Sequence, residues 1–185
     1  MKKIILRYFP YWLNALEIMG VIGILLTAIF FQFFAHEIPC PLCLLQRIGF
    51  FGIALGILMN FKFGIHAGHY AICILSAIFT SIVALRQTLL HIIPGTGSYG
   101  GTFLGYHFYT LSFAISIVYI VVFAISIMIG LGRTLTPYHK RPRWQKLMIN
   151  AFFIILFGLI VLHIYTTFLE CGLGICPENP TGYKY

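Results

Sequence analysis

Residues 107–131 read HFYTLSFAISIVYIVVFAISIMIGL, an apolar run of the length that a helix needs to cross a bilayer. About 20 residues, each rising about 1.5 Å, span the hydrocarbon of a membrane. Four further runs of this kind occur at residues 11–35, 45–61, 70–93 and 147–169. The sequence therefore predicts an all-α integral membrane protein, a helix bundle of five transmembrane helices.

The composition supports a membrane protein. Of the 185 residues, 60% are hydrophobic and 9% are charged, which is far from the average soluble domain. We expect a single membrane domain over residues 1–185, with short connections and a tail at about 170–185. The net charge of +8 does not indicate a nucleic-acid partner, because the basic residues stand beside apolar runs rather than on a polar domain.

The positive charges predict the orientation of the chain, since Lys and Arg of short connections stay on the cytoplasmic side. They precede the first run, separate the second from the third, and separate the fourth from the fifth: Lys2, Lys3, Arg7, Lys62, Arg133, Lys140, Arg141, Arg143 and Lys146. We therefore predict a cytoplasmic N-terminus and, after five crossings, an outer C-terminus.

This orientation places four of the five cysteines outside. Cys40 and Cys43 fall in the first outer connection, and Cys171 and Cys176 fall in the outer tail. An oxidising outer compartment favours disulfides over thiolate ligands, although a C-x-x-C motif is also half of a zinc site, which the tail pair could complete. The remaining cysteine, Cys73, is expected to be a small packing residue.

The stretch PCPLCLLQR, residues 39–47, begins at the predicted membrane surface and enters the second helix. The unpaired N–H groups of a helix N-terminus stabilise a thiolate there, and Cys43 gains most. Arg47 follows four residues later on the same helix face, where it could hold an anion or a carbonyl oxygen, or extend to lipid phosphate. Arg86, in the outer half of the third predicted helix, could face the same region or also extend outward.

The motif Cys40-Pro41-Leu42-Cys43 followed by Gln46-Arg47 resembles the disulfide bond formation protein B family, DsbB, and the stretch GYHFY at 105–109 is similar to some members. The resemblance implies a protein-disulfide:quinone oxidoreductase of the bacterial inner membrane. Such an enzyme reoxidises a periplasmic DsbA-type thiol oxidase and passes electrons to ubiquinone or menaquinone. By the same resemblance Cys40 and Cys43 are catalytic and Arg47 binds the quinone, for which Arg86 is a weaker candidate.

The chain departs from the familiar layout of that family, in which the second cysteine pair lies between helices three and four. Here that connection has no cysteine, and a fifth predicted helix leads to Cys171 and Cys176. The chain therefore looks like a variant whose tail pair accepts electrons from the soluble oxidase, although this pair could instead be a structural staple. Two other functions stay open: a quinone reductase like vitamin K epoxide reductase, and a metal-binding or assembly protein that uses the outer cysteines as ligands.

Overall fold

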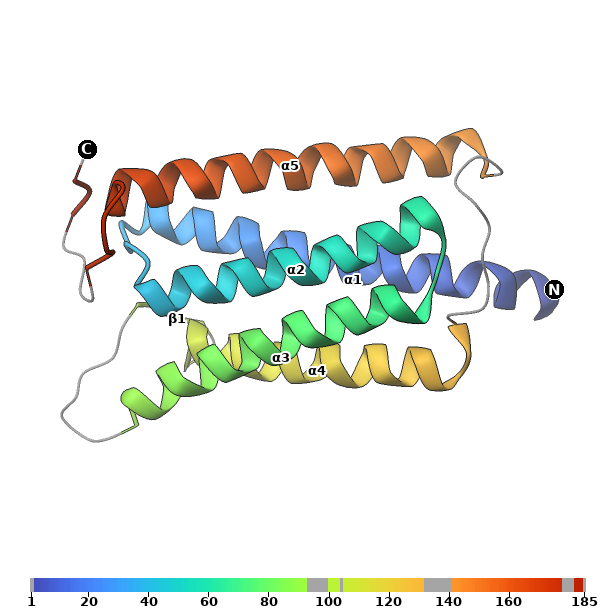
Figure 1. The fold of residues 1–185 in the computed structure, drawn as a ribbon, viewed down its shortest axis with the longest axis horizontal. Coiled ribbons are helices and arrows are strands. Elements are labelled where there is room, and N and C mark those ends of the chain that lie inside the picture. The colour runs from blue at the N-terminus through green and yellow to red at the C-terminus, as the bar shows by residue number, and fades with distance from the viewer. Residues whose placement is uncertain (1, 93–99, 104, 132–140, 178–181, 185) are drawn as a thin grey trace.

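The computed structural model describes residues 2–92, 100–103, 105–131, 141–177 and 182–184, and the side chains of residues 2–8 are left out (Figure 1). Five helices are long and apolar enough to cross a membrane. They confirm the predicted helical membrane bundle, so the chain is a multi-pass membrane protein. The helices are α1 Lys2–Phe34, α2 Pro41–Phe63, α3 Ala67–Leu90, α4 Phe108–Met128 and α5 Arg143–Cys171.

Helix α2 begins at Pro41, four residues before its predicted start. The Cys40 sulfur caps the helix by accepting the backbone N–H of Cys43 at 3.1 Å. Proline suits the first helical position because its missing N–H would have no partner there and its φ is already helical. As a result Cys43 lies in the first turn of α2, not in a connection before it.

The two ends of the bundle hold different parts of the chain. In Figure 1 the start of α2 and the end of α5 lie at one end of the molecule, whereas the turn between α2 and α3 lies at the other end. We call the first of these the cysteine end. It holds both pairs predicted from the sequence, about 130 residues apart along the chain, and the start of α1 lies at the opposite end.

Small residues let α2 and α3 pack closely. A Cβ atom added at Gly56 would lie 2.8 Å from the carbonyl oxygen of His69 and would also overlap the Cys73 sulfur. Cys73 itself is fully buried in the core, and its thiol donates to the carbonyl oxygen of Ile53 at 3.5 Å. These contacts confirm the packing role predicted for Cys73.

The fifth helix packs against α2. Phe152 stacks on Phe61 with ring centroids 5.8 Å apart, and His163 meets Phe51 edge-on at 5.2 Å. Because these two contacts lie about three helical turns apart on α5, they hold α5 along much of the length of α2.

A short hairpin, not expected in an all-α protein, precedes α4. Strand β1 Thr102–Phe103 pairs with β2 Tyr106–His107, and Gly105 between them has the positive φ of 81° that glycine adopts without a steric cost. The backbone N–H of Gly101 donates to Glu37 Oε2 at 2.9 Å. This bond ties the segment before the hairpin to the connection between α1 and α2.

Candidate functional site

Cys40 and Cys43 form a dithiol at the start of α2. A side-chain amide from α3 contacts both sulfurs, because Gln87 Nε2 lies 3.2 Å from Cys40 Sγ and 3.4 Å from Cys43 Sγ. The Gln87 side chain is buried, and its Oε1 accepts a 2.6 Å hydrogen bond from Gln46 Nε2. The two sulfurs therefore share one donor that is held in place by two helices.

The two thiols differ in position. Cys40 is buried, whereas Cys43 is partly exposed. The hydrogen bond of Cys40 to the Cys43 sulfur and the burial of Cys40 raise the pKa of the Cys40 thiol well above the usual range. Backbone N–H groups act in the opposite direction. In the dithiol, Cys40 therefore keeps its proton at neutral pH.

A pocket of about 420 Å³ opens beside Cys43, between α1, α2 and α4. Its polar lining includes Cys43, Gln46 and Arg47, and most of the remainder is apolar. The apolar lining includes Ile24, Leu25, Phe31, Phe50, Phe108, Leu111 and Ile115. This volume is in the range of small-molecule sites, and the lining suits an apolar ligand with a few polar atoms.

The Arg47 side chain is held inside the bundle. Its Nη1 donates to Gln32 Oε1 at 2.7 Å, and its Nη2 donates to the carbonyl oxygen of Ala28 at 3.3 Å. Gln32 is in turn buried, and its Nε2 donates to the Tyr183 hydroxyl at 3.2 Å. Contacts to α1 therefore fix the guanidinium at the wall of the pocket, next to Cys43.

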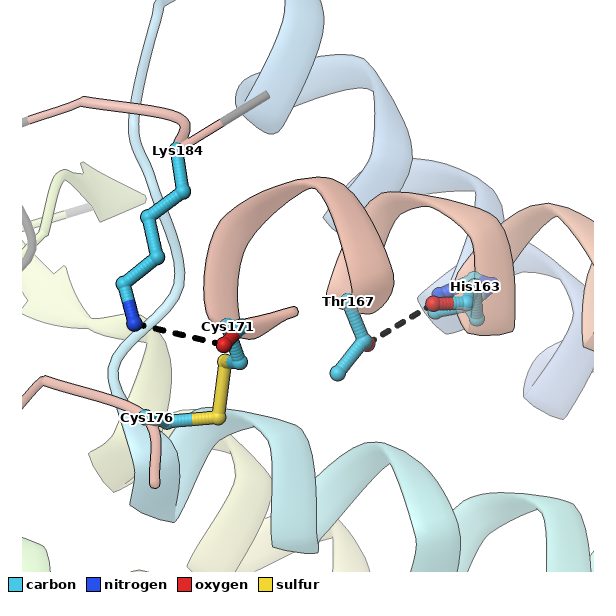
Figure 2. Close-up of a disulfide and its surroundings, with 5 residues drawn as sticks. All are labelled: His163, Thr167, Cys171, Cys176 and Lys184. Carbon is cyan, nitrogen blue, oxygen red and sulfur yellow. Dashed lines mark hydrogen bonds between the residues drawn. A yellow bond between two sulfur atoms is a disulfide. The ribbon is translucent and has the colours of Figure 1, made fainter. Parts of the chain in front are cut away.

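The tail cysteines form a disulfide at the end of α5, with Cα atoms 4.6 Å apart. Figure 2 shows Lys184 folded back onto this helix end, where its Nζ donates to the carbonyl oxygen of Cys171 at 3.3 Å. Cys171 is buried and Cys176 is partly exposed. Between them Leu173 and Ile175 are 98% and 94% exposed, so the ring closed by the disulfide presents apolar side chains outward.

The structure separates two neighbouring residues of α3. Arg86 is exposed and is not among the residues that line the pocket, so its predicted role in quinone binding stays a prediction. Gln87, one residue later and about 100° further around the helix, contacts both sulfurs. From the sequence, Gln87 and Arg86 could both face this region, but a role was predicted only for Arg86.

In the part of the chain that the structure describes, no three His, Cys, Asp or Glu side chains lie close enough together to hold a metal ion. The tail cysteines are paired with each other, and Cys40 and Cys43 contact Gln87. The described residues therefore offer no site to support the metal-binding alternative.

The comparison with protein families supports one of the functions that the sequence left open. The family described as disulfide bond formation protein DsbB matches residues 10–98. This part of the chain belongs to the DsbB family. The DsbB match includes most of α1, all of α2 and α3, and with them Cys40, Cys43 and Arg47, so it links this part of the chain to membrane oxidoreductases of disulfide bond formation.

The DsbB match ends before α4 and α5, so it does not include the pair Cys171 and Cys176. No curated protein and no solved structure shows a significant match to the chain. The role of the tail pair must therefore be argued from this chain alone.

Proposed function

We propose that this protein is a protein-disulfide:quinone oxidoreductase, which reoxidises a periplasmic DsbA-type thiol oxidase and passes the electrons to ubiquinone or menaquinone. One observation carries the proposal: Cys43 and Arg47 line the same apolar pocket between helices that are able to span a membrane. A reactive sulfur and a cation thus line one pocket that a lipid-soluble acceptor could enter.

The lining of the pocket fits a quinone headgroup. Apolar side chains of α1 and α4 would contact the flat ring, and Arg47 would donate to a carbonyl oxygen. The quinone supplies a two-electron acceptor when it is bound. Arg47 would stabilise negative charge that develops on that oxygen, while Gln87 and Gln46 hold the sulfurs in place.

The energetics favour an acceptor of this class. A DsbA-type oxidase has a potential of about −120 mV, and for two electrons about 30 mV corresponds to about 1.4 kcal/mol. Reoxidising the reduced form of so strong an oxidant requires an acceptor of higher potential, which a membrane quinone provides.

Electron entry is assigned to the tail disulfide. A thiolate of the soluble partner attacks the more exposed sulfur, Cys176, and Cys171 leaves as a thiolate. The second thiol of the partner then releases the mixed disulfide, so that the partner is oxidised and the tail pair is reduced. The tail dithiol next reduces a Cys40–Cys43 disulfide by the same exchange, and the resulting dithiol yields two electrons and two protons to the acceptor.

The proposed location is the bacterial inner membrane, with the cysteine end in the periplasm. This assignment rests on the positive charges of the sequence, because Lys62 and Arg143 lie at the opposite end of the bundle from both cysteine pairs. A reporter active only in the cytoplasm should be inactive when fused after Tyr185. An active fusion would contradict the proposed orientation.

Substitution of Arg47 tests the acceptor site. In Arg47→Ala we expect a KM for quinone at least tenfold higher, since a charged hydrogen bond contributes about 1.5 kcal/mol or more. Exchange between the soluble oxidase and the tail pair should keep its rate. Lys62→Ala, which removes an exposed cation from the far end of the same helix, is the matched control.

Both activities are measured by rapid mixing, with quinone absorbance for the first and trapped mixed disulfide for the second. An Arg47→Ala protein with parental KM and kcat for quinone would overturn the proposed role of Arg47. Failure of the parental protein to reduce any quinone would overturn the function itself.

A further inference from the structure

The end of the chain folds back onto two helices. The backbone N–H of Lys184 donates to the carbonyl oxygen of Leu169 at 2.9 Å, and its Nζ donates to that of Cys171 at 3.3 Å (Figure 2). The last carbonyl groups of a helix have no partner inside it, so these two bonds cap α5. Tyr183, one residue earlier, contacts α1 instead, because its hydroxyl accepts from Gln32 Nε2 at 3.2 Å. The contact of Tyr183 is not needed for the cap of α5 and therefore has another role.

Gln32 is a buried amide near the end of α1. It is 1% exposed, and a buried amide is costly unless its polar atoms are hydrogen-bonded. Its Oε1 accepts from Arg47 Nη1 at 2.7 Å. A guanidinium carries only donors, so the amide must turn its oxygen toward Arg47, and its nitrogen then needs an acceptor on the other side. The Tyr183 hydroxyl is that acceptor.

The position of Arg47 depends on this amide. Its second hydrogen bond, from Nη2 to the carbonyl oxygen of Ala28, is longer at 3.3 Å. The shorter bond to Gln32 is thus the stronger restraint on the guanidinium, which lines the pocket beside Cys43. Tyr183, Gln32 and Arg47 therefore form one hydrogen-bonded chain from the tail of the protein to the wall of the pocket.

We propose that Tyr183 is a positioning residue of the acceptor site: its hydroxyl holds the Gln32 amide in the orientation that fixes the Arg47 guanidinium at the pocket. Without this acceptor, Gln32 either keeps its orientation with a buried N–H group unpaired, or turns toward water and releases Arg47. The segment that follows the tail disulfide thereby contributes to the pocket on α2. The meaning of this inference for quinone binding rests on the proposed function.

Chemical modification of Arg47 tests the inference without quinone. Phenylglyoxal bonds to both terminal nitrogens of an arginine, so a guanidinium that is hydrogen-bonded at Nη1 and Nη2 should react slowly. In the purified full-length protein, we expect Tyr183→Phe to raise the modification rate of Arg47 about fivefold, the ratio expected for the loss of one neutral hydrogen bond. Peptide mass spectrometry measures the rate, with the exposed Arg86 of the same sample as the internal reference.

A second exposed tyrosine provides the matched control. Tyr165 on α5 is 57% exposed and Tyr183 is 39% exposed. Because both side chains lie largely outside the core, neither substitution by phenylalanine should unfold the protein. Tyr165→Phe should leave the modification rate of Arg47 at the parental value.

A change at Gln32 separates the orientation of the amide from a loosened tail. In Gln32→Glu, both side-chain oxygens can accept from Arg47, and no N–H group of this side chain needs a partner. Adding Tyr183→Phe to this background should therefore leave the modification rate of Arg47 unchanged. A tail that moved away from the pocket would accelerate the reaction in both backgrounds. Equal acceleration in both, or a parental rate in Tyr183→Phe alone, would overturn the inference.

Quinone kinetics then test the link to the acceptor site. Tyr183→Phe should raise the KM for quinone about fivefold, while kcat and the rate of mixed-disulfide formation at the tail stay at their parental values. An unchanged KM would overturn the role of Tyr183 at this site. Absence of quinone reduction in the parental protein would instead overturn the proposed function, because the modification of Arg47 is measured without quinone and without the soluble oxidase.

Discussion

The two cysteine pairs lie at one end of the bundle but in opposite surroundings. Cys40 and Cys43 begin a helix, contact the buried amide of Gln87 and adjoin an apolar pocket. Cys171 and Cys176 end a helix and close a ring in which Leu173 and Ile175 are almost fully exposed. Each pair has one buried and one partly exposed cysteine, but the first adjoins an apolar pocket and the second closes a ring whose apolar side chains face outward.

The difference indicates that the two pairs serve different reaction partners. A pair held beside a pocket can serve an acceptor dissolved in lipid, while a pair in an exposed ring can be reached by a soluble protein. The location of each pair relative to a helix reinforces the contrast, because a helix N-terminus stabilises a thiolate and a C-terminus does not. Each prediction below tests this contrast between the two pairs.

Replacement of Cys176 should have the largest effect. In Cys176→Ser we expect oxidation of the soluble thiol oxidase to fall to the background rate, because its point of attack is gone. Quinone reduction driven by a small dithiol should remain near the parental rate, since Cys40 and Cys43 are intact. If the Cys171→Ser, Cys176→Ser double variant oxidised the soluble protein at the parental rate, the tail pair would be a structural staple.

The rate of alkylation should also differ between the two pairs. In the fully reduced protein at neutral pH, we expect Cys40 to be labelled at least tenfold more slowly than Cys176, because the raised pKa of Cys40 keeps it protonated. The labelling rate of Cys40 should therefore increase only as the pH rises toward that pKa. Peptide mass spectrometry after timed quenching measures both rates, and equal labelling at neutral pH would contradict the contrast.

Substitutions in the exposed ring should change the KM for the protein partner only. Replacing both Leu173 and Ile175 by serine should raise the KM for the soluble oxidase by about tenfold, since each contact with an apolar side chain contributes about 0.7 kcal/mol. The KM for a small dithiol should not change, because such a donor needs only the disulfide. An equal rise with both donors would indicate that the substitutions distort the ring.

The amide that contacts the inner pair should have the smallest effect. Gln87→Ala should slow quinone reduction by about fivefold, corresponding to the loss of about 1 kcal/mol of hydrogen bonding to the sulfurs. Formation of the mixed disulfide at Cys176 should keep its rate. Gln87→Glu should slow quinone reduction at least as much, since an ionised carboxylate cannot donate to sulfur.

Much of the architecture was predictable from composition and order. Five apolar runs predicted five helices because a segment in lipid must satisfy its own backbone hydrogen bonds, which only a helix of about 20 residues does locally. Alternation along the chain then required both cysteine pairs to share an end, as Figure 1 shows. The start of α2 was placed too late, because capping by the Cys40 sulfur depends on a local geometry that hydropathy does not report.

The identity of the residues around the sulfurs was decided only by tertiary structure. Arg86 and Gln87 are adjacent in the sequence and both are polar, yet of the two only Gln87 contacts the dithiol, because the packing of α3 on α2 sets the rotation of the helix. The sequence by itself determined that Cys43 and Arg47 share one helix face, since that follows from spacing. The hydrogen bond between Arg47 and Gln32 could not follow from spacing, because it depends on how α1 and α2 pack together.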